Sequence, residues 1–148
     1  MTYVDRVRFA DVDFARIPFY GRYFTWVDRA WEQALNEHGI WFAEMVGKRG
    51  IGLPIVEAVS RYRRPLGLDD EFAVDLRVCD LSRRGLTTEF RFRRTRDADG
   101  EPASDGHIRR RFVDMEAFRP TELPDDLHAS FARVAAGLRA WPAPEAPA

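Results

Sequence analysis

The chain has 148 residues, of which 45% are hydrophobic and 32% charged, and its formal net charge is −1. This length fits one domain, and the composition excludes disordered and fibrous classes. No apolar run reaches the roughly 18 residues of a membrane span, and the single cysteine, Cys79, excludes an internal disulfide, so we expect one cytoplasmic domain over residues 1–140.

The first half of the chain predicts a strand, a loop and one long helix. Residues 3–9 alternate apolar and charged side chains, as a half-buried strand does. After an irregular stretch at 10–18, apolar residues recur every three or four positions from 20 to 35, and Gly39 supplies a C-terminal cap. Because Trp26 lies off that apolar stripe, we expect the helix to be buried on more than one side.

In the second half, the apolar residues alternate with a period of two. After a short helical piece and a glycine-punctuated loop, this pattern predicts strands at 54–64, 72–79, 86–93 and 107–115. Short turns separate the strands, at 67–70, 82–85 and 97–100, so we expect neighbours in sequence to pair antiparallel.

A last helix is predicted to open at Pro124, where two aspartates follow the proline. The Pro/Ala-rich tail at 141–148 is expected to be disordered. Taken together, the order of elements predicts an α+β fold in which an antiparallel sheet packs on one long, apolar helix.

The loop before the long helix carries two carboxylates, Asp11 and Asp13. The unpaired N–H groups and the positive dipole end of a helix N-terminus favour the charged form of a nearby carboxylate. Such a carboxylate can attack a carbonyl carbon or orient a water, while the free N–H groups hold the resulting oxyanion. The alternative is that Asp13 caps the helix, and this stretch in isolation favours the cap.

A succession of short motifs extends this pattern. Asp11-Val12-Asp13 is followed by the run Ile17-Pro18-Phe19-Tyr20 and by Tyr23 in the helix. In this order and spacing, residues 6–30 resemble the opening of the 4-hydroxybenzoyl-CoA thioesterase family of hotdog-fold proteins. The similarity continues downstream, in the segments 50–56, 61–65, 69–71 and 81–86.

This resemblance implies a hotdog fold, in which a curved antiparallel sheet of about five strands wraps a long central helix. It also implies hydrolysis of an acyl-CoA or acyl-carrier-protein thioester with no metal and no cofactor besides the CoA of the substrate. The family's catalytic carboxylate, acting as nucleophile or general base, corresponds to Asp13. Its oxyanion donor, a backbone N–H at the start of the helix, corresponds to Tyr20.

Two positions of the loop and helix depart from the family's pattern. Arg16 stands where many members carry glycine, and Arg22 stands where asparagine is commoner. We expect Arg16 either to crowd the loop or to pair with Asp13, which would keep that carboxylate charged but weaken it as a nucleophile.

Candidate substrate-binding residues fall into two groups. Phe14, Phe19 and Tyr23 neighbour the second aspartate of the motif, and they either line a pocket for an aromatic or medium-length acyl group or belong to the core. Arg83 and Arg84 lie in a strand turn where the family often places basic residues against CoA phosphates, with an ordinary solvated turn as an equal alternative.

Other functions are less well supported by the residues. His107 and His128 lack partners at ligand spacing, which argues against a metal site, and the near-neutral charge argues against a nucleic-acid or membrane partner. A hotdog dehydratase needs a histidine near the helix, and none occurs in residues 1–37. The remaining alternative is a non-catalytic acyl-thioester-binding or scaffold protein. By resemblance we expect a homodimer or homotetramer whose active site lies where two chains meet.

Overall fold

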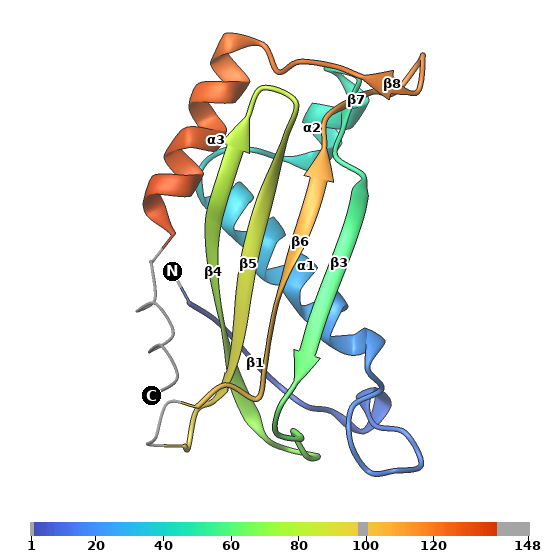
Figure 1. Cartoon of the computed structure of the whole chain (residues 1–148), viewed down its shortest axis with the longest axis vertical. Coiled ribbons are helices and arrows are strands. Elements are labelled where there is room, and N and C mark those ends of the chain that lie inside the picture. The colour runs from blue at the N-terminus through green and yellow to red at the C-terminus, as the bar shows by residue number, and fades with distance from the viewer. Residues whose placement is uncertain (1, 98–100, 139–148) are drawn as a thin grey trace, which may run out of the picture.

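Helix α1 (Gly21–Glu37) forms where the apolar stripe predicts it and lies against one face of an antiparallel sheet (Figure 1). The structure is a computed structural model that describes residues 2–97 and 101–138, so residues 98–100 of the predicted hairpin loop and the predicted tail at 141–148 lie outside it. Gly39 adopts a left-handed φ of 77° just beyond the helix, which confirms the predicted cap.

The main sheet has the order β1-β4-β5-β6-β3, and every neighbouring pair is antiparallel. Its strands are β1 (Thr2–Arg6), β3 (Ile55–Tyr62), β4 (Glu71–Ser82), β5 (Gly85–Arg94) and β6 (Ser104–Arg111). Alternation places one set of side chains against α1 and the other on the outer face. On the inner face, Phe72 and Val74 of β4 and Phe90 and Phe92 of β5 are fully or almost fully buried. The α+β hotdog prediction is confirmed.

One expectation about the topology is wrong. Strands β3 and β4 follow each other in sequence but do not pair, because β3 pairs with β6 and β4 pairs with β1. The connection at 63–70 carries Leu66, which is fully buried, and it crosses the end of the sheet instead of reversing as a hairpin. Asp70 fastens this crossing, since its carboxylate accepts the Gly67 N–H at 2.7 Å and its carbonyl accepts the Val7 N–H at 2.9 Å.

The predicted strand at 107–115 is divided in the structure. Strand β6 ends at Arg111, Phe112 turns into the core, and the chain continues in a second, small sheet of order β2-β7-β8. The strands of this sheet have two residues each, so they are too short to show the alternation of apolar and polar residues that predicts a strand. The remaining elements are α2 (Phe42–Gly47), β2 (Ile51–Gly52), β7 (Val113–Asp114), β8 (Arg119–Pro120) and the predicted C-terminal helix α3 (Asp125–Gly137).

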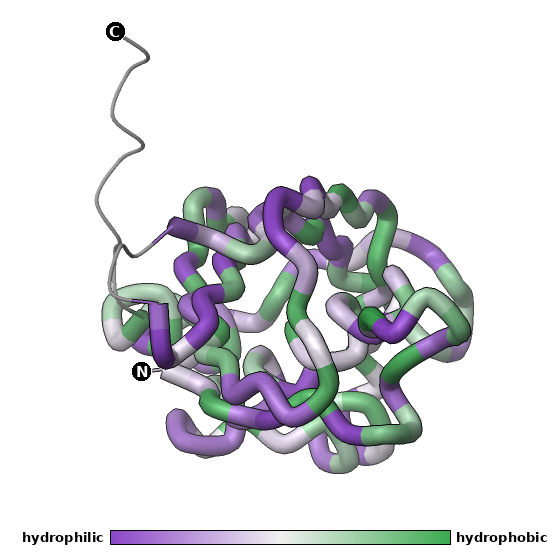
Figure 2. The backbone as a smooth tube through the Cα atoms, turned by 90° about the horizontal axis from the view of Figure 1, so that it is seen from below, coloured by the Kyte–Doolittle hydropathy of each residue, from purple (hydrophilic) through white to green (hydrophobic). Residues whose placement is uncertain are grey.

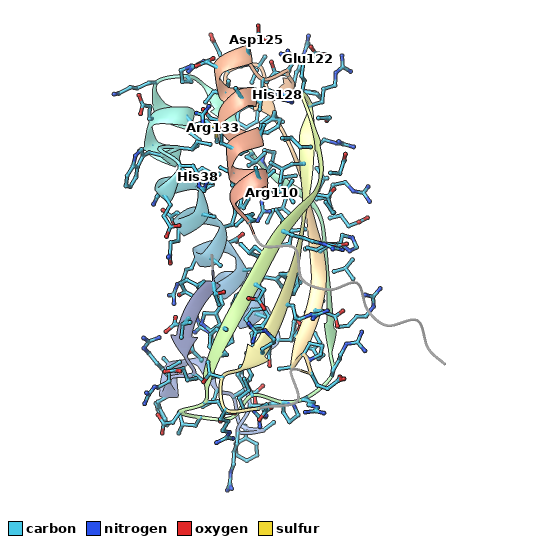
Figure 3. All side chains as sticks on the ribbon, turned by 90° about the vertical axis from the view of Figure 1, so that its left-hand side faces the viewer. His38, Arg110, Glu122, Asp125, His128 and Arg133 are labelled. Carbon is cyan, nitrogen blue, oxygen red and sulfur yellow. The ribbon has the colours of Figure 1, made fainter. Side chains whose placement is uncertain are left out.

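A buried arginine ties α1 to the sheet. Arg110 of β6, labelled in Figure 3, is only 2% exposed. Its guanidinium lies 2.9 Å from the Asp28 carboxylate of α1. It also donates to the Thr88 hydroxyl at 2.9 Å and stacks over the Trp31 ring, 5.4 Å from its centroid. Burial lowers the pKa of Arg110, and the neighbouring Asp28 carboxylate opposes that shift. The local sequence does not indicate this burial, because Arg110 stands in a run of three consecutive arginines.

We expect the two halves of this ion pair to respond unequally to mutation. Asp28→Ala leaves a buried guanidinium without its carboxylate and should lower the free energy of unfolding by about 3 kcal/mol. Arg110→Met should cost less, because the Asp28 side chain is 53% exposed and water can solvate it. Urea unfolding measures both, with the exposed Glu32→Ala one turn along the helix as a control near zero. Equal losses for the two variants would contradict this account.

Candidate active site

The segment between β1 and α1 folds into a tight loop at one end of the sheet (Figure 1). Val12 and Pro18 face each other across an isolated antiparallel bridge, and the Asp13 N–H donates to the Ile17 carbonyl at 3.0 Å. Since Phe19 follows this bridge directly and α1 begins two residues later, Asp13 and the start of the helix are held at the same end of the molecule.

The two aspartates of the motif have different surroundings. Asp11 stabilises the loop, because its carboxylate accepts the Arg8 N–H at 2.8 Å and lies 3.7 Å from Arg22 Nε. Asp13 is exposed, and its carboxylate accepts only the Ala15 N–H, at 2.8 Å, among the described residues. The interpretation of Asp13 as a helix cap is wrong, since the residue in the N-cap position of α1 is Tyr20. Asp13 therefore keeps carboxylate oxygens open to a substrate or a water.

Tyr20 lies at the junction between this loop and α1. No described residue accepts a hydrogen bond from its N–H, whereas its carbonyl accepts the Tyr62 hydroxyl of β3 at 3.0 Å. Tyr62 thus helps to fix the backbone next to the free donor. Sequence reasoning missed this positioning role, and the only available signal was that Tyr62 falls within the segment 61–65 of the family resemblance.

Arg16 adopts a strained backbone conformation in the loop. It adopts a φ of 66°, a left-handed conformation that glycine reaches without strain. Its N–H donates to the Asp13 carbonyl at 2.9 Å, but within the described chain its guanidinium forms no ion pair with the Asp13 carboxylate. The expected pairing of Arg16 with Asp13 is therefore not found, and the carboxylate is not neutralised from this side.

The three predicted acyl-pocket aromatics are placed differently. Phe14 is fully exposed at the tip of the loop, and Phe19 is 48% exposed. Tyr23 is buried in the core, where it packs edge-on against Trp26 and Phe92, and burial raises the pKa of its hydroxyl. A hollow of about 430 Å³ lies beside the loop, lined by Ala10, Asp11, Val12, Phe19, Gly21, Arg22 and Thr25. Of the three aromatics, only Phe19 borders that hollow.

Arg83 and Arg84 lie in the β4–β5 turn at the other end of the sheet from the loop (Figure 1). Arg83 pairs with Asp125, the first residue of α3, at 2.7 Å, and Arg84 pairs with Glu122, which precedes α3, at 3.0 Å (Figure 3 labels both acids). One subunit therefore does not bring these arginines to Asp13. Their predicted role in phosphate binding stays a prediction.

The outer face of the sheet carries another carboxylate, Glu57 of β3. Glu57 lies 2.7 Å from His107 and 2.9 Å from Arg109, and the hydrogen bond with His107 is the largest of the effects that lower the pKa of Glu57. It is thus paired, and it sits across the sheet from α1. The described residues contain no cluster of three metal-ligating side chains and no helix long and apolar enough to cross a membrane.

Comparison with known proteins agrees with this architecture. A family model described as the thioesterase-like superfamily matches residues 7–131, and the chain belongs to this family. A solved gentisyl-coenzyme A thioesterase is 30% identical, with a TM-score of 0.76 over 88% of this chain and 99% of that one. A Staphylococcus aureus protein solved in complex with CoA shares the fold, with a TM-score of 0.84 at 19% identity over 97% of this chain and 89% of that one.

Curated relatives point in the same direction. A 1,4-dihydroxy-2-naphthoyl-CoA hydrolase of Prochlorococcus marinus is 33% identical over 94 residues, which cover 59% of this chain and 62% of the relative. A second such hydrolase of the same species is 26% identical over 82% of this chain and 80% of its own length. The chain thus matches somewhat less than two thirds of the first relative's length. The predicted family membership is confirmed.

The left-handed conformation of Arg16 predicts a stability difference between two variants. Arg16→Gly relieves the backbone strain, whereas Arg16→Ala removes the same side chain and keeps the strain. We expect the glycine variant to be more stable than the alanine variant by about 1 kcal/mol, measured by urea unfolding. A glycine variant less stable than the alanine variant would show that the loop does not hold this φ in solution.

Proposed function

We propose that this protein hydrolyses an acyl-CoA thioester to a free acid and CoA. The observation that carries the proposal is that the loop leading into α1 exposes the Asp13 carboxylate and ends at Tyr20, whose N–H has no acceptor among the described residues. A carboxylate and a fixed N–H donor at one site are the two groups that acyl transfer needs. Membership of the thioesterase-like superfamily supports the same reaction.

The chemistry assigns one role to each group. The Asp13 carboxylate attacks the thioester carbonyl, or takes a proton from a water that attacks it, and the carbonyl oxygen becomes an oxyanion. The Tyr20 N–H donates a hydrogen bond to that oxyanion as it forms. The C–S bond then breaks and CoA leaves as the thiolate. On the general-base route the thiolate takes the proton that Asp13 removed from the water, and on the nucleophilic route it takes a proton from solvent. On the nucleophilic route, water next hydrolyses the mixed anhydride and restores Asp13.

We propose that the acyl group is aromatic. The relatives are named for dihydroxynaphthoyl-CoA and gentisyl-CoA, both of which carry an aromatic acyl group. In this chain, the ring of Phe19 borders the hollow beside the loop and offers a flat apolar wall. Rates on acyl-CoA and on acyl-carrier-protein thioesters distinguish the two carriers of the acyl group.

The proposal for CoA binding involves Arg83 and Arg84. Both arginines are paired with exposed carboxylates, and such surface pairs are weak. A CoA phosphate carries more charge than a carboxylate and binds the planar guanidinium fork well, so it can displace Asp125 and Glu122. Because these arginines lie far from Asp13 in one chain, this role requires a second copy, and we propose a cytoplasmic homodimer or homotetramer as the active form.

The test of this proposal is Asp13→Asn, assayed on a panel of aromatic and aliphatic acyl-CoA and acyl-carrier-protein thioesters by thiol release. The variant should lose about 10²–10⁴-fold in kcat/KM with unchanged folding and subunit assembly. Asp80→Asn, which removes another exposed carboxylate, should keep full activity.

Two outcomes would contradict the proposal. Equal rates for Asp13→Asn and the wild-type protein would remove Asp13 as the catalytic group. A folded wild-type protein that binds acyl-CoA but hydrolyses no member of the panel would favour the alternative of a non-catalytic acyl-thioester-binding or scaffold protein.

A further inference from the structure

Two exposed apolar groups lie at opposite ends of the molecule. The loop before α1 exposes Phe9, Phe14 and Phe19, and Figure 2, seen from below, looks onto that end and shows hydrophobic stretches among the hydrophilic ones. At the other end, Phe118 in the β7–β8 hairpin is 77% exposed. Clustered aromatic side chains at a surface usually mark a contact with another molecule.

The β7–β8 hairpin holds Phe118 outward by a defined structure. The Asp114 carboxylate accepts the N–H groups of Glu116 and Ala117 at 2.9 and 2.7 Å, which fixes the turn. Phe118 itself has a φ of 50°, a left-handed conformation that is costly for a bulky residue. A strained and exposed phenylalanine on a fixed turn is unfavourable for an isolated chain, and a contact at its ring would offset that cost.

Strand β3 has a free edge at which another strand can pair. It is an edge strand paired on one side with β6, and the Val59 carbonyl oxygen faces Gly106 of β6. Backbone groups alternate in an antiparallel strand, so the N–H and C=O groups of Ala58 and Ser60 face the free edge. An open edge of eight residues is a template for another strand.

The occupant that fits this edge is a second copy of the same chain. When β3 pairs antiparallel with itself about Val59, Ala58 lies opposite the partner's Ser60, so the groups facing the edge meet one another. The same register places Glu57 opposite the partner's Arg61, and opposite charges on facing strands attract. Because the two-fold operation repeats this contact, the edge is complementary to itself.

From this geometry, and resting on the proposed function, we propose that Phe118 of the partner subunit covers the active-site loop. Antiparallel pairing reverses one subunit relative to the other, so the end with the β7–β8 hairpin comes beside the end with the loop. Both features lie toward the β3 side of the sheet (Figure 1). The partner's Phe118 then meets the exposed rings of Phe14 and Phe19, closes the acyl site and excludes water from it.

Disulfide crosslinking tests the contact without relying on activity. In a Cys79→Ser background, the pair Phe14→Cys and Phe118→Cys is expected to give a covalent dimer under mild oxidation. Each single cysteine, and the matched pair Phe14→Cys with Val46→Cys on α2, should stay monomeric on a non-reducing gel. A Phe14–Phe118 pair that crosslinks no more than these controls would overturn the proposal.

Subunit complementation tests whether Phe118 acts across the interface. Phe118→Ala should raise KM for an aromatic acyl-CoA about tenfold, as truncation of a buried aromatic anchor does. A heterodimer of one Asp13→Asn chain and one Phe118→Ala chain then contains one intact site, and it should show about half of the wild-type kcat with the wild-type KM.

A heterodimer with the raised KM of the Phe118→Ala variant would place Phe118 in the same subunit as its Asp13 and overturn the proposal. If the wild-type protein hydrolyses none of the thioesters, the proposed function fails, while the crosslinking result still decides the position of the hairpin.

Discussion

The site depends on the aromatic packing between α1 and the inner face of the sheet. Trp26 lies 4.5 Å from Phe72 between ring centroids, and Tyr23 lies 5.1 Å from Phe92. Large rings bury much apolar area and interlock in few ways, so they resist sliding of the helix along the sheet. This packing therefore sets where α1 begins, and with it the position of the Tyr20 N–H.

Polar contacts then connect the start of α1 to the loop before it and to β3. Tyr62 reaches from β3 to the Tyr20 carbonyl, and Arg22 on the first turn of α1 donates to the Ala10 carbonyl at 3.0 Å. Both contacts lie at the N-terminal end of α1, where the first N–H groups lack helical acceptors. The proposed oxyanion role of the Tyr20 N–H requires a donor whose position is set before the reaction, and the packed core with these short contacts is the part of the structure that sets it.

Periodicity predicted the elements well where packing is regular. The stripe of α1 and the alternation of β4 and β5 were readable because their inner faces are continuously apolar. Pairing was less readable: β3 and β6 are distant in sequence, and only the buried Leu66 in the connection shows why β3 does not reverse into β4. Likewise, composition treats Arg110 as a surface residue, because its burial depends on Asp28, 82 positions away.

The candidate site, too, was predictable only in part from the sequence. The family resemblance singled out Asp13 and Tyr20 as candidates, whereas the local sequence in isolation favoured a helix cap for Asp13. It could not assign Tyr23 to the core or separate Arg83 from Asp13, because both facts arise from tertiary arrangement. The separation bears on the proposed function. One chain holds Asp13 and these arginines at opposite ends of its sheet, so the proposed CoA-binding role of Arg83 and Arg84 needs the arginines of a second chain. The free edge of β3 and the exposed hairpin are the features of this chain that allow such an arrangement.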